Sequence, residues 1–164
     1  MSITNTFRLQ SLADTDRLAA ALADQLSMPL PNVPMAIGLT GPLGAGKTQL
    51  VRSLASHLGI ATEMVTSPTY VLVQRYYGRL TLIHLDFYRL STTDQVWDLG
   101  LDEWLAEPAL TVIEWCEKFP QCLPEELLSI ELSLVSETIR SARLTARGAR
   151  ATAILDALPA ALGT

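Results

Sequence analysis

The residues best suited to chemistry lie in a glycine-rich loop, GPLGAGKT, which spans residues 41–48. The loop matches the pattern G-x-x-x-x-G-K-[ST], in which glycines allow backbone angles that turn successive N–H groups toward an anion. Lys47 can then reach the β- and γ-phosphates of a nucleotide, and the Thr48 hydroxyl can bind Mg²⁺. We therefore predict a nucleotide site whose loop contacts come from Gly41, Pro42, Leu43, Gly44, Ala45, Gly46, Lys47 and Thr48.

Two carboxylates follow apolar, strand-like runs and form the second chemical feature. Asp86 closes LTLIHLD, and Glu114 closes LTVIE. In an open α/β sheet both strand ends point toward the crevice that also contains the phosphate loop, where a carboxylate can hold Mg²⁺ or orient water. Thr48, Asp86 and Glu114 are therefore the candidate metal ligands, and Lys47, Asp86 and Glu114 the candidate catalytic residues. The sequence leaves open which carboxylate serves the metal.

Three other residues have two readings each. Thr69 in TSPTYVLV can approach the γ-phosphate as a switch threonine, or it can cap the backbone before a strand. His84 lies among apolar residues without a second nitrogen or thiol at metal-ligand spacing, so we expect a structural role. Arg140 belongs to an arginine-rich stretch that fits a solvated edge hairpin better than a nucleic-acid surface.

The elements that must position these residues are predicted from apolar periodicity. A buried strand over residues 35–40 precedes the loop, and a helix follows it from Lys47 to a stop at Gly59. This context disfavours a chance match in a glycine turn. A hairpin turns at Gly78, a helical pattern covers residues 92–107, and a short strand covers 109–115.

The two ends of the chain complete the predicted domain. The first part gives an edge strand over residues 6–12, a helix capped by Asp14 or Thr15, and a proline-rich loop over residues 28–34. Two more strands and a helix over residues 149–162 end the chain. We predict an α/β fold, one P-loop NTPase domain over residues 1–164, with a mixed, mainly parallel central sheet flanked by helices.

Composition limits the function further. The 164 residues are 49% hydrophobic, enough for one core, and no apolar run approaches the roughly 18 residues of a membrane helix. We expect a cytoplasmic protein without membrane contact. The formal net charge of −5 argues against a strong surface of its own for RNA or DNA, because neutralising phosphates supplies most of that affinity.

Four stretches in this order, GPLGAGKTQL, SPTYVLVQRY, HLDFYRL and VIEWCEKFPQCLP, resemble the TsaE (YjeE) family. The resemblance implies a Mg²⁺-dependent ATPase that works with TsaD and TsaB to form threonylcarbamoyladenosine beside the anticodon of tRNA. It implies that tRNA is reached through that complex. It also assigns Thr48 and Glu114 to Mg²⁺, Thr69 and Asp86 to two switch segments, and Trp115 to a functional segment. Pro42 and Cys116 depart from the family pattern, which puts a partner contact at residue 42 in doubt.

Alternative functions remain open at the level of sequence. No obvious arginine finger is present, and since such a group is worth about 10³ to 10⁵ in rate, hydrolysis should be slow alone and faster with a partner. A small P-loop kinase acting on a metabolite is the other enzyme class, although the chain offers no spare segment for a lid. A non-catalytic nucleotide switch is the third possibility, and the lack of an NKxD motif disfavours GTP.

Overall fold

The computed structural model describes residues 3–28, 33–159 and 162. Its strands are β1 (Ile3–Leu9), β2 (Met35–Thr40), β3 (Val73–Tyr76), β4 (Leu82–Asp86), β5 (Leu110–Glu114), β6 (Leu127–Leu134) and β7 (Arg140–Arg147). Its α-helices are α1 (Leu12–Ser27), α2 (Lys47–His57), α3 (Thr93–Asp98), α4 (Leu101–Ala106) and α5 (Ala149–Ala157). None of the helices in these described ranges is long and apolar enough to cross a membrane.

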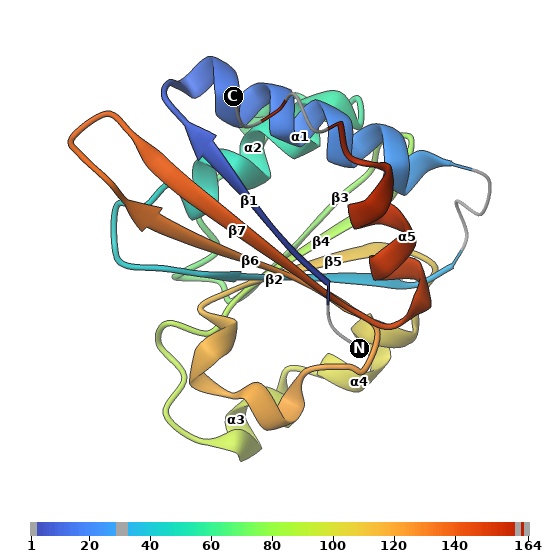
Figure 1. Cartoon of the computed structure of the whole chain (residues 1–164). Coiled ribbons are helices and arrows are strands. Elements are labelled where there is room, and N and C mark those ends of the chain that lie inside the picture. Colours follow the sequence, from blue (N-terminus) through green and yellow to red (C-terminus); the bar gives the residue numbers. More distant parts are fainter. Residues whose placement is uncertain (1–2, 29–32, 160–161, 163–164) are drawn as a thin grey trace.

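The seven strands form one twisted sheet in the order β1-β7-β6-β2-β5-β4-β3 (Figure 1). The four central strands, β6, β2, β5 and β4, are parallel to one another. Antiparallel pairs add β7 and β1 at one edge and β3 at the other. The predicted α/β fold with a mixed sheet and a parallel centre is confirmed. The first strand is an edge strand as expected, but it covers residues 3–9 and not 6–12, because Ser11 and Leu12 already belong to the start of α1.

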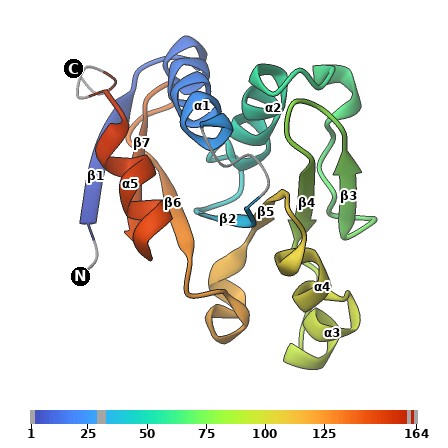
Figure 2. The ribbon, with the colours of Figure 1, turned by 90° about the vertical axis from the view of Figure 1, so that its right-hand side faces the viewer.

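Helices cover both faces of the sheet, as the two perpendicular views show (Figures 1 and 2). On one face, α1, α2 and α5 bury a large core that includes Leu22, Leu54 and Ile154. On the other, α3, α4 and two short 3₁₀ turns between residues 116 and 122 cover a smaller core around Phe87 and Ile113. Because successive strand residues point to opposite faces, each buried strand contributes to both cores.

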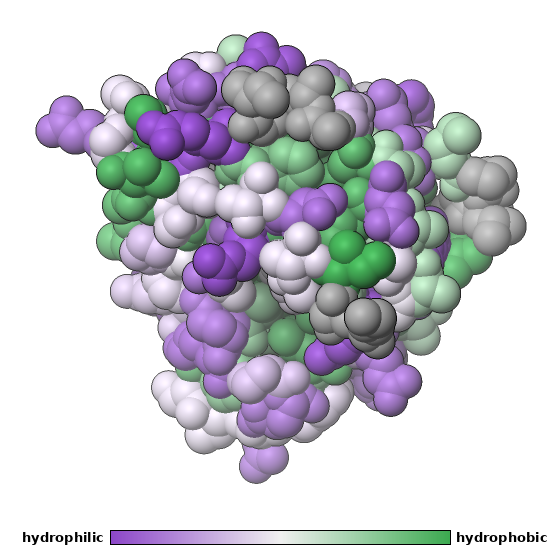
Figure 3. All heavy atoms as spheres, in the orientation of Figure 1, coloured by the Kyte–Doolittle hydropathy of each residue, from purple (hydrophilic) through white to green (hydrophobic). Residues whose placement is uncertain are grey.

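The outer surface mixes residue types. Figure 3 shows hydrophilic residues interspersed with small apolar groups over the visible face, and no single apolar area dominates that view.

The first helix begins earlier than predicted. Ser11 is the N-cap, and its side chain accepts a hydrogen bond from the backbone N–H of Asp14 at 3.4 Å. The Asp14 carboxylate accepts in return from the backbone N–H of Ser11, which completes a capping box. The prediction that Asp14 or Thr15 caps this helix was therefore wrong, because Asp14 is the third residue of its first turn.

A glycine also divides the helix predicted over residues 92–107. Gly100 adopts the left-handed backbone conformation (φ +75°), which ends α3 and begins α4. Trp97 is consequently 43% exposed, whereas Trp104 packs against the smaller core. The last helix is shorter than predicted and ends at Ala157, two residues before Pro159. The predicted proline-rich loop lies largely outside the described residues.

Candidate functional site

The phosphate loop joins the end of β2 to the start of α2, as the motif requires. Gly41, Gly44 and Gly46 all have positive φ, and Gly46 is the N-cap of α2 without a side-chain cap. A Cβ on Gly44 or Gly46 would meet no atom within 4 Å, so open space borders the loop there. Within the described chain, no backbone carbonyl accepts a hydrogen bond from the N–H groups of Gly44, Gly46, Lys47 or Thr48. These free donors at a helix N-terminus suit an anion.

Lys47 lies across the loop and is buried, with an exposed fraction of 5%. Its Nζ donates to the carbonyl oxygens of Gly41 at 2.6 Å and Pro42 at 3.0 Å. The same Nζ lies 3.8 Å from the centre of the Trp115 ring, in cation–π geometry. Burial lowers the pKa of Lys47 below its ordinary value, and the nearby carboxylates, chiefly Glu114, act in the opposite direction. The ammonium group is therefore held by the loop carbonyls and the Trp115 ring.

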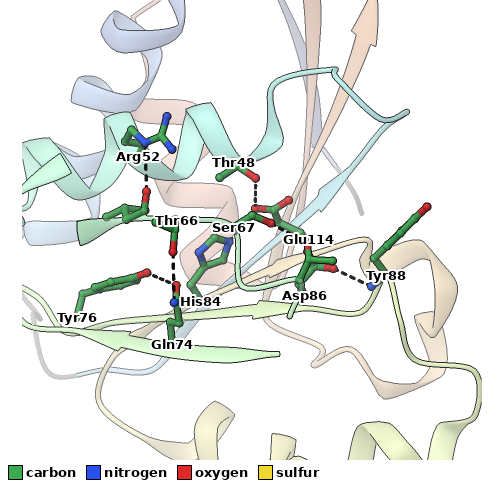
Figure 4. A network of polar contacts seen from close by, with 12 residues as sticks. Thr48, Arg52, Thr66, Ser67, Gln74, Tyr76, His84, Asp86, Tyr88 and Glu114 are labelled. Atoms are coloured by element: carbon green, nitrogen blue, oxygen red, sulfur yellow. Dashed lines mark hydrogen bonds and ion pairs between the residues drawn. The ribbon is translucent and has the colours of Figure 1, made fainter. Parts of the chain in front are cut away.

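The two predicted carboxylates end neighbouring parallel strands. Asp86 of β4 pairs in register with Glu114 of β5, and their exposed fractions are 1% and 3%. The Thr48 hydroxyl donates a hydrogen bond to Glu114 Oε1 at 2.9 Å, which joins the first turn of α2 to the end of β5 (Figure 4). The donated proton leaves the lone pairs of the hydroxyl oxygen available to another ligand.

Asp86 has a different set of partners. Its Oδ2 accepts from the Thr69 hydroxyl at 2.6 Å, and its Oδ1 accepts from the Tyr88 backbone N–H at 2.7 Å. Thr69 also shares a hydrogen bond of 2.7 Å with Ser67. The geometry therefore places the Thr69 side chain at the acidic end of β4. The guanidinium carbon of Arg89, which follows Tyr88, lies 4.1 Å from the centre of the Tyr70 ring.

His84 was assigned a structural role, and the structure places it beside the acidic cluster. It is fully buried on β4, and its Nε2 lies 2.8 Å from Glu114 Oε1 (Figure 4). The sequence carried one usable signal for this position. His84 and Asp86 are two residues apart in a strand, so they share the face that looks toward the phosphate loop.

Two cavities border the loop. A polar cleft of about 220 Å³ is lined by Leu43, Gly44, Gly46, Lys47, Thr48, Gln49, Ser67, Thr69, Asp86, Glu114 and Trp115. A larger, more apolar cavity of about 600 Å³ is lined by Leu9, Gln10, Ser11, Leu12, Thr15, Ala45, Gly46, Gln49, Leu132, Glu137, Thr138 and Arg140. The predicted loop residues therefore have different roles. Ala45 lines the apolar cavity, whereas the carbonyl oxygens of Gly41 and Pro42 accept hydrogen bonds from Lys47. Sequence reasoning missed the apolar cavity entirely.

The donor set of the polar cleft fits Mg²⁺ with a nucleotide. Mg²⁺ usually takes one or two carboxylates, substrate phosphates and several waters, so it needs no large cage of protein ligands. The described residues contain no group of three or more His, Cys, Asp or Glu side chains arranged to hold a metal alone. The arrangement of a hydroxyl bonded to a carboxylate, next to free amides and an ammonium, is suited to a metal–phosphate complex.

The unusual Cys116 is accommodated by packing. It is buried behind β2, where a Cβ on Gly38 would lie 2.7 Å from its Sγ, so Gly38 leaves the space that the thiol fills. Burial raises the pKa of the Cys116 thiol to about 12. The residue therefore acts as a small apolar group and removes no contact of the phosphate loop.

Comparison with known proteins points to one family. The family model described as threonylcarbamoyl adenosine biosynthesis protein TsaE matches residues 9–143. The tRNA threonylcarbamoyladenosine biosynthesis protein TsaE of Rickettsia bellii is 34% identical over 138 residues, which cover 84% of this chain and 92% of that protein. The protein of the same name from Bacillus subtilis is 39% identical over 113 residues, covering 68% and 70%.

The fold agrees with a solved structure. The crystal structure of YdiB from Bacillus subtilis superposes with a TM-score of 0.76 at 27% sequence identity and covers 96% of this chain and 95% of that one. The family match spans the phosphate loop, both acidic strand ends and the strands that carry them. The chain therefore belongs to the TsaE family of threonylcarbamoyl adenosine biosynthesis proteins.

Proposed function

We propose that this chain binds ATP with Mg²⁺ in the polar cleft and hydrolyses it in support of tRNA threonylcarbamoyladenosine formation, together with TsaD and TsaB. The observation that carries the proposal is the hydrogen bond from Thr48 to Glu114 beside free loop amides. It joins the two groups that a P-loop ATPase uses for its metal. Family membership supports the pathway, and the loop geometry supports the nucleotide.

Within this proposal the two carboxylates have different tasks. Glu114 and Thr48 are the metal-holding pair, because the hydroxyl already donates to the carboxylate and keeps its lone pairs free. When bound, Mg²⁺ would neutralise charge on the β- and γ-phosphates. Asp86 holds Thr69 and is the better candidate for orienting water, since neither of its oxygens contacts Thr48 among the described residues.

The apolar cavity is the proposed site of the nucleoside. It meets the polar cleft at Gly46 and Gln49, so a ligand whose phosphates lie along the loop can extend its base into the cavity. Leucine side chains offer apolar walls for a ring, and Gln10 and Arg140 offer polar groups at its edge.

Slow hydrolysis by the chain alone also follows from the cleft. In the described part of the chain no arginine lines it, so Lys47 is not joined there by the arginine finger that usually stabilises the transferring phosphate. We propose that a partner completes the site. Access to tRNA through that partner agrees with the net charge of −5.

The test is ATP hydrolysis by wild-type protein and by Lys47→Ala, each with and without TsaD and TsaB. We expect a slow basal rate and a clear increase with the partners for the wild type, and loss of both for Lys47→Ala. Arg143→Ala is the control, because Arg143 is an exposed residue of β7 that forms an ion pair with Glu131 at 3.5 Å and lines neither cavity in the described part of the chain. Rapid hydrolysis that the partners leave unchanged would contradict the proposal, and phosphate appearing on a metabolite would favour a kinase.

A further inference from the structure

His84 makes a polar contact that a residue with only a core-filling role would not need. It is a fully buried residue of β4, and its ring lies beside the Glu114 carboxylate, which also contacts Thr48 (Figure 4). The contact joins two adjacent parallel strands by side chains, in addition to their backbone ladder.

The geometry assigns the proton of the His84 ring. A carboxylate can only accept, so Nε2 at 2.8 Å must donate to Glu114 Oε1. Nδ1 is buried and has no hydrogen-bond partner in the described structure. A proton on Nδ1 would be a buried donor without an acceptor, which is disfavoured. The ring therefore has one suitable tautomer, with its proton on Nε2.

This bond determines how Glu114 is held. Oε1 accepts from both His84 Nε2 and the Thr48 hydroxyl, while Oε2 accepts no hydrogen bond among the described residues. The two donors come from β4 and α2, so together they fix the rotation of the carboxylate. Without His84, only Thr48 would remain, and Thr48 is itself a proposed metal ligand.

We infer that His84 is a positioning residue, which holds the Glu114 carboxylate in the orientation that Mg²⁺ with nucleotide requires. The inference rests on the proposed function of the cleft. Partners that orient a metal ligand in this way commonly change metal affinity by about 10- to 100-fold when they are removed. A residue that only filled the core would instead change stability and leave the effect of Mg²⁺ untouched.

The test compares nucleotide affinity with and without Mg²⁺ in variants of the full chain. A fluorescent ADP analogue is titrated in Mg²⁺ and again in EDTA, and the ratio of the two affinities measures the contribution of the metal. We expect His84→Leu to lower that ratio about tenfold with little change in EDTA. His84→Gln, whose amide can replace the Nε2 donor, should stay within about threefold of wild type. Ile83→Val is the matched control, because Ile83 faces the other core.

A second measurement does not depend on nucleotide. ¹⁵N NMR of the free wild-type protein should show the His84 proton on Nε2 and a bare Nδ1, and the opposite tautomer would overturn the inference. A Mg²⁺ effect that survives His84→Leu would overturn it as well, as would equal losses in His84→Leu and His84→Gln. Wild-type protein that binds no nucleotide, or binds it without any effect of Mg²⁺, would instead contradict the proposed function on which the inference rests.

Discussion

The two cavities beside the phosphate loop share Gly46 and Gln49 but differ in volume and in all of their other lining residues. The polar cleft of about 220 Å³ contains Lys47 and both buried carboxylates. The apolar cavity of about 600 Å³ is lined by leucines at positions 9, 12 and 132, together with polar side chains such as Gln10 and Arg140. The proposed chemistry belongs to the first and the proposed base recognition to the second.

The difference lies in how each cavity is built. Most of the polar cleft comes from one continuous loop and two strand ends, so it depends on the parallel centre of the sheet. The apolar cavity lies between the β1–α1 junction and the β6–β7 hairpin, so it depends on the antiparallel edge. The two regions can therefore be disturbed separately.

The largest effect should come from Gly41, at the start of the phosphate loop. A Cβ on Gly41 would collide with the backbone carbonyl oxygen of Leu132, and Leu132 lines the apolar cavity. We expect Gly41→Ala to lower the free energy of unfolding by about 3 kcal/mol, because Leu132 lies within β6 and Gly41 directly follows β2, so neither backbone can move without disturbing a strand. Urea unfolding measures the loss.

Gly44→Ala is the matched comparison for that change. Gly44 also has a positive φ (+79°), but a Cβ there meets no atom within 4 Å. Only backbone strain remains, which costs about 1 kcal/mol. Equal losses in the two variants would show that the contact with Leu132 does not matter.

A change of pH should have an intermediate effect on ADP affinity, and this effect should arise in the polar cleft alone. Burial lowers the pKa of Lys47, so its ammonium loses its proton at a lower pH than an ordinary lysine. Affinity for ADP should fall by up to about tenfold per pH unit once pH exceeds this lowered pKa, below the ordinary value of 10.5. Equilibrium binding between pH 7 and pH 10 measures the fall.

Loss of the Lys47 proton should lower ADP affinity but raise the stability of the free protein. Between the lowered folded pKa and 10.5 the unfolded chain binds more protons, so this lysine makes the free protein more stable as pH rises. Lys47→Arg provides the control, because a guanidinium does not titrate in this range. The ADP affinity of that variant should therefore not change with pH. A similar slope in that variant would assign the pH dependence to another group.

The smallest effect is expected in the apolar cavity. Leu12 lines it and is 71% exposed at the first position of α1, where aspartate is favourable for the helix. We expect Leu12→Asp to weaken ATP binding about fivefold, because it removes apolar surface from the base and adds negative charge. Calorimetric titration with ATP and with tripolyphosphate separates the cavities, since tripolyphosphate should bind with almost unchanged affinity.

Ala13→Asp adds the same charge one position later. Ala13 is exposed and does not line the cavity, so this variant should bind both ligands like wild type. If Ala13→Asp weakens ATP as much as Leu12→Asp does, the apolar cavity is not where the base binds.

The polar region could be predicted from sequence because its residues are adjacent or end recognisable strands. The loop, its strand and its helix follow from a contiguous motif, and Asp86 and Glu114 follow from the ends of apolar runs. The contact of His84 with Glu114 required the register of β4 and β5, which a single sequence does not contain.

The remaining differences have local causes. The capping box of α1 was signalled by serine at position 11 and aspartate three residues later, but the apolar spacing starts further along the chain. Gly100 is compatible with a helical pattern in sequence, and only its left-handed conformation divides α3 from α4. The apolar cavity combines residues more than one hundred positions apart, so no local pattern predicts it.

Trp115 shows where stability and the proposed activity conflict in this molecule. Directly after Glu114 it has a φ of +58°, a conformation that glycine adopts without strain and a bulky residue does not. Its ring lies against Lys47 and, at 4.9 Å between centres, against Tyr88. A designer seeking a more heat-resistant variant would be drawn to place glycine here, because glycine relaxes the backbone. The same change would remove the ring that covers Lys47, on which the proposed site depends. Residue 115 is thus a position for engineers to leave unchanged.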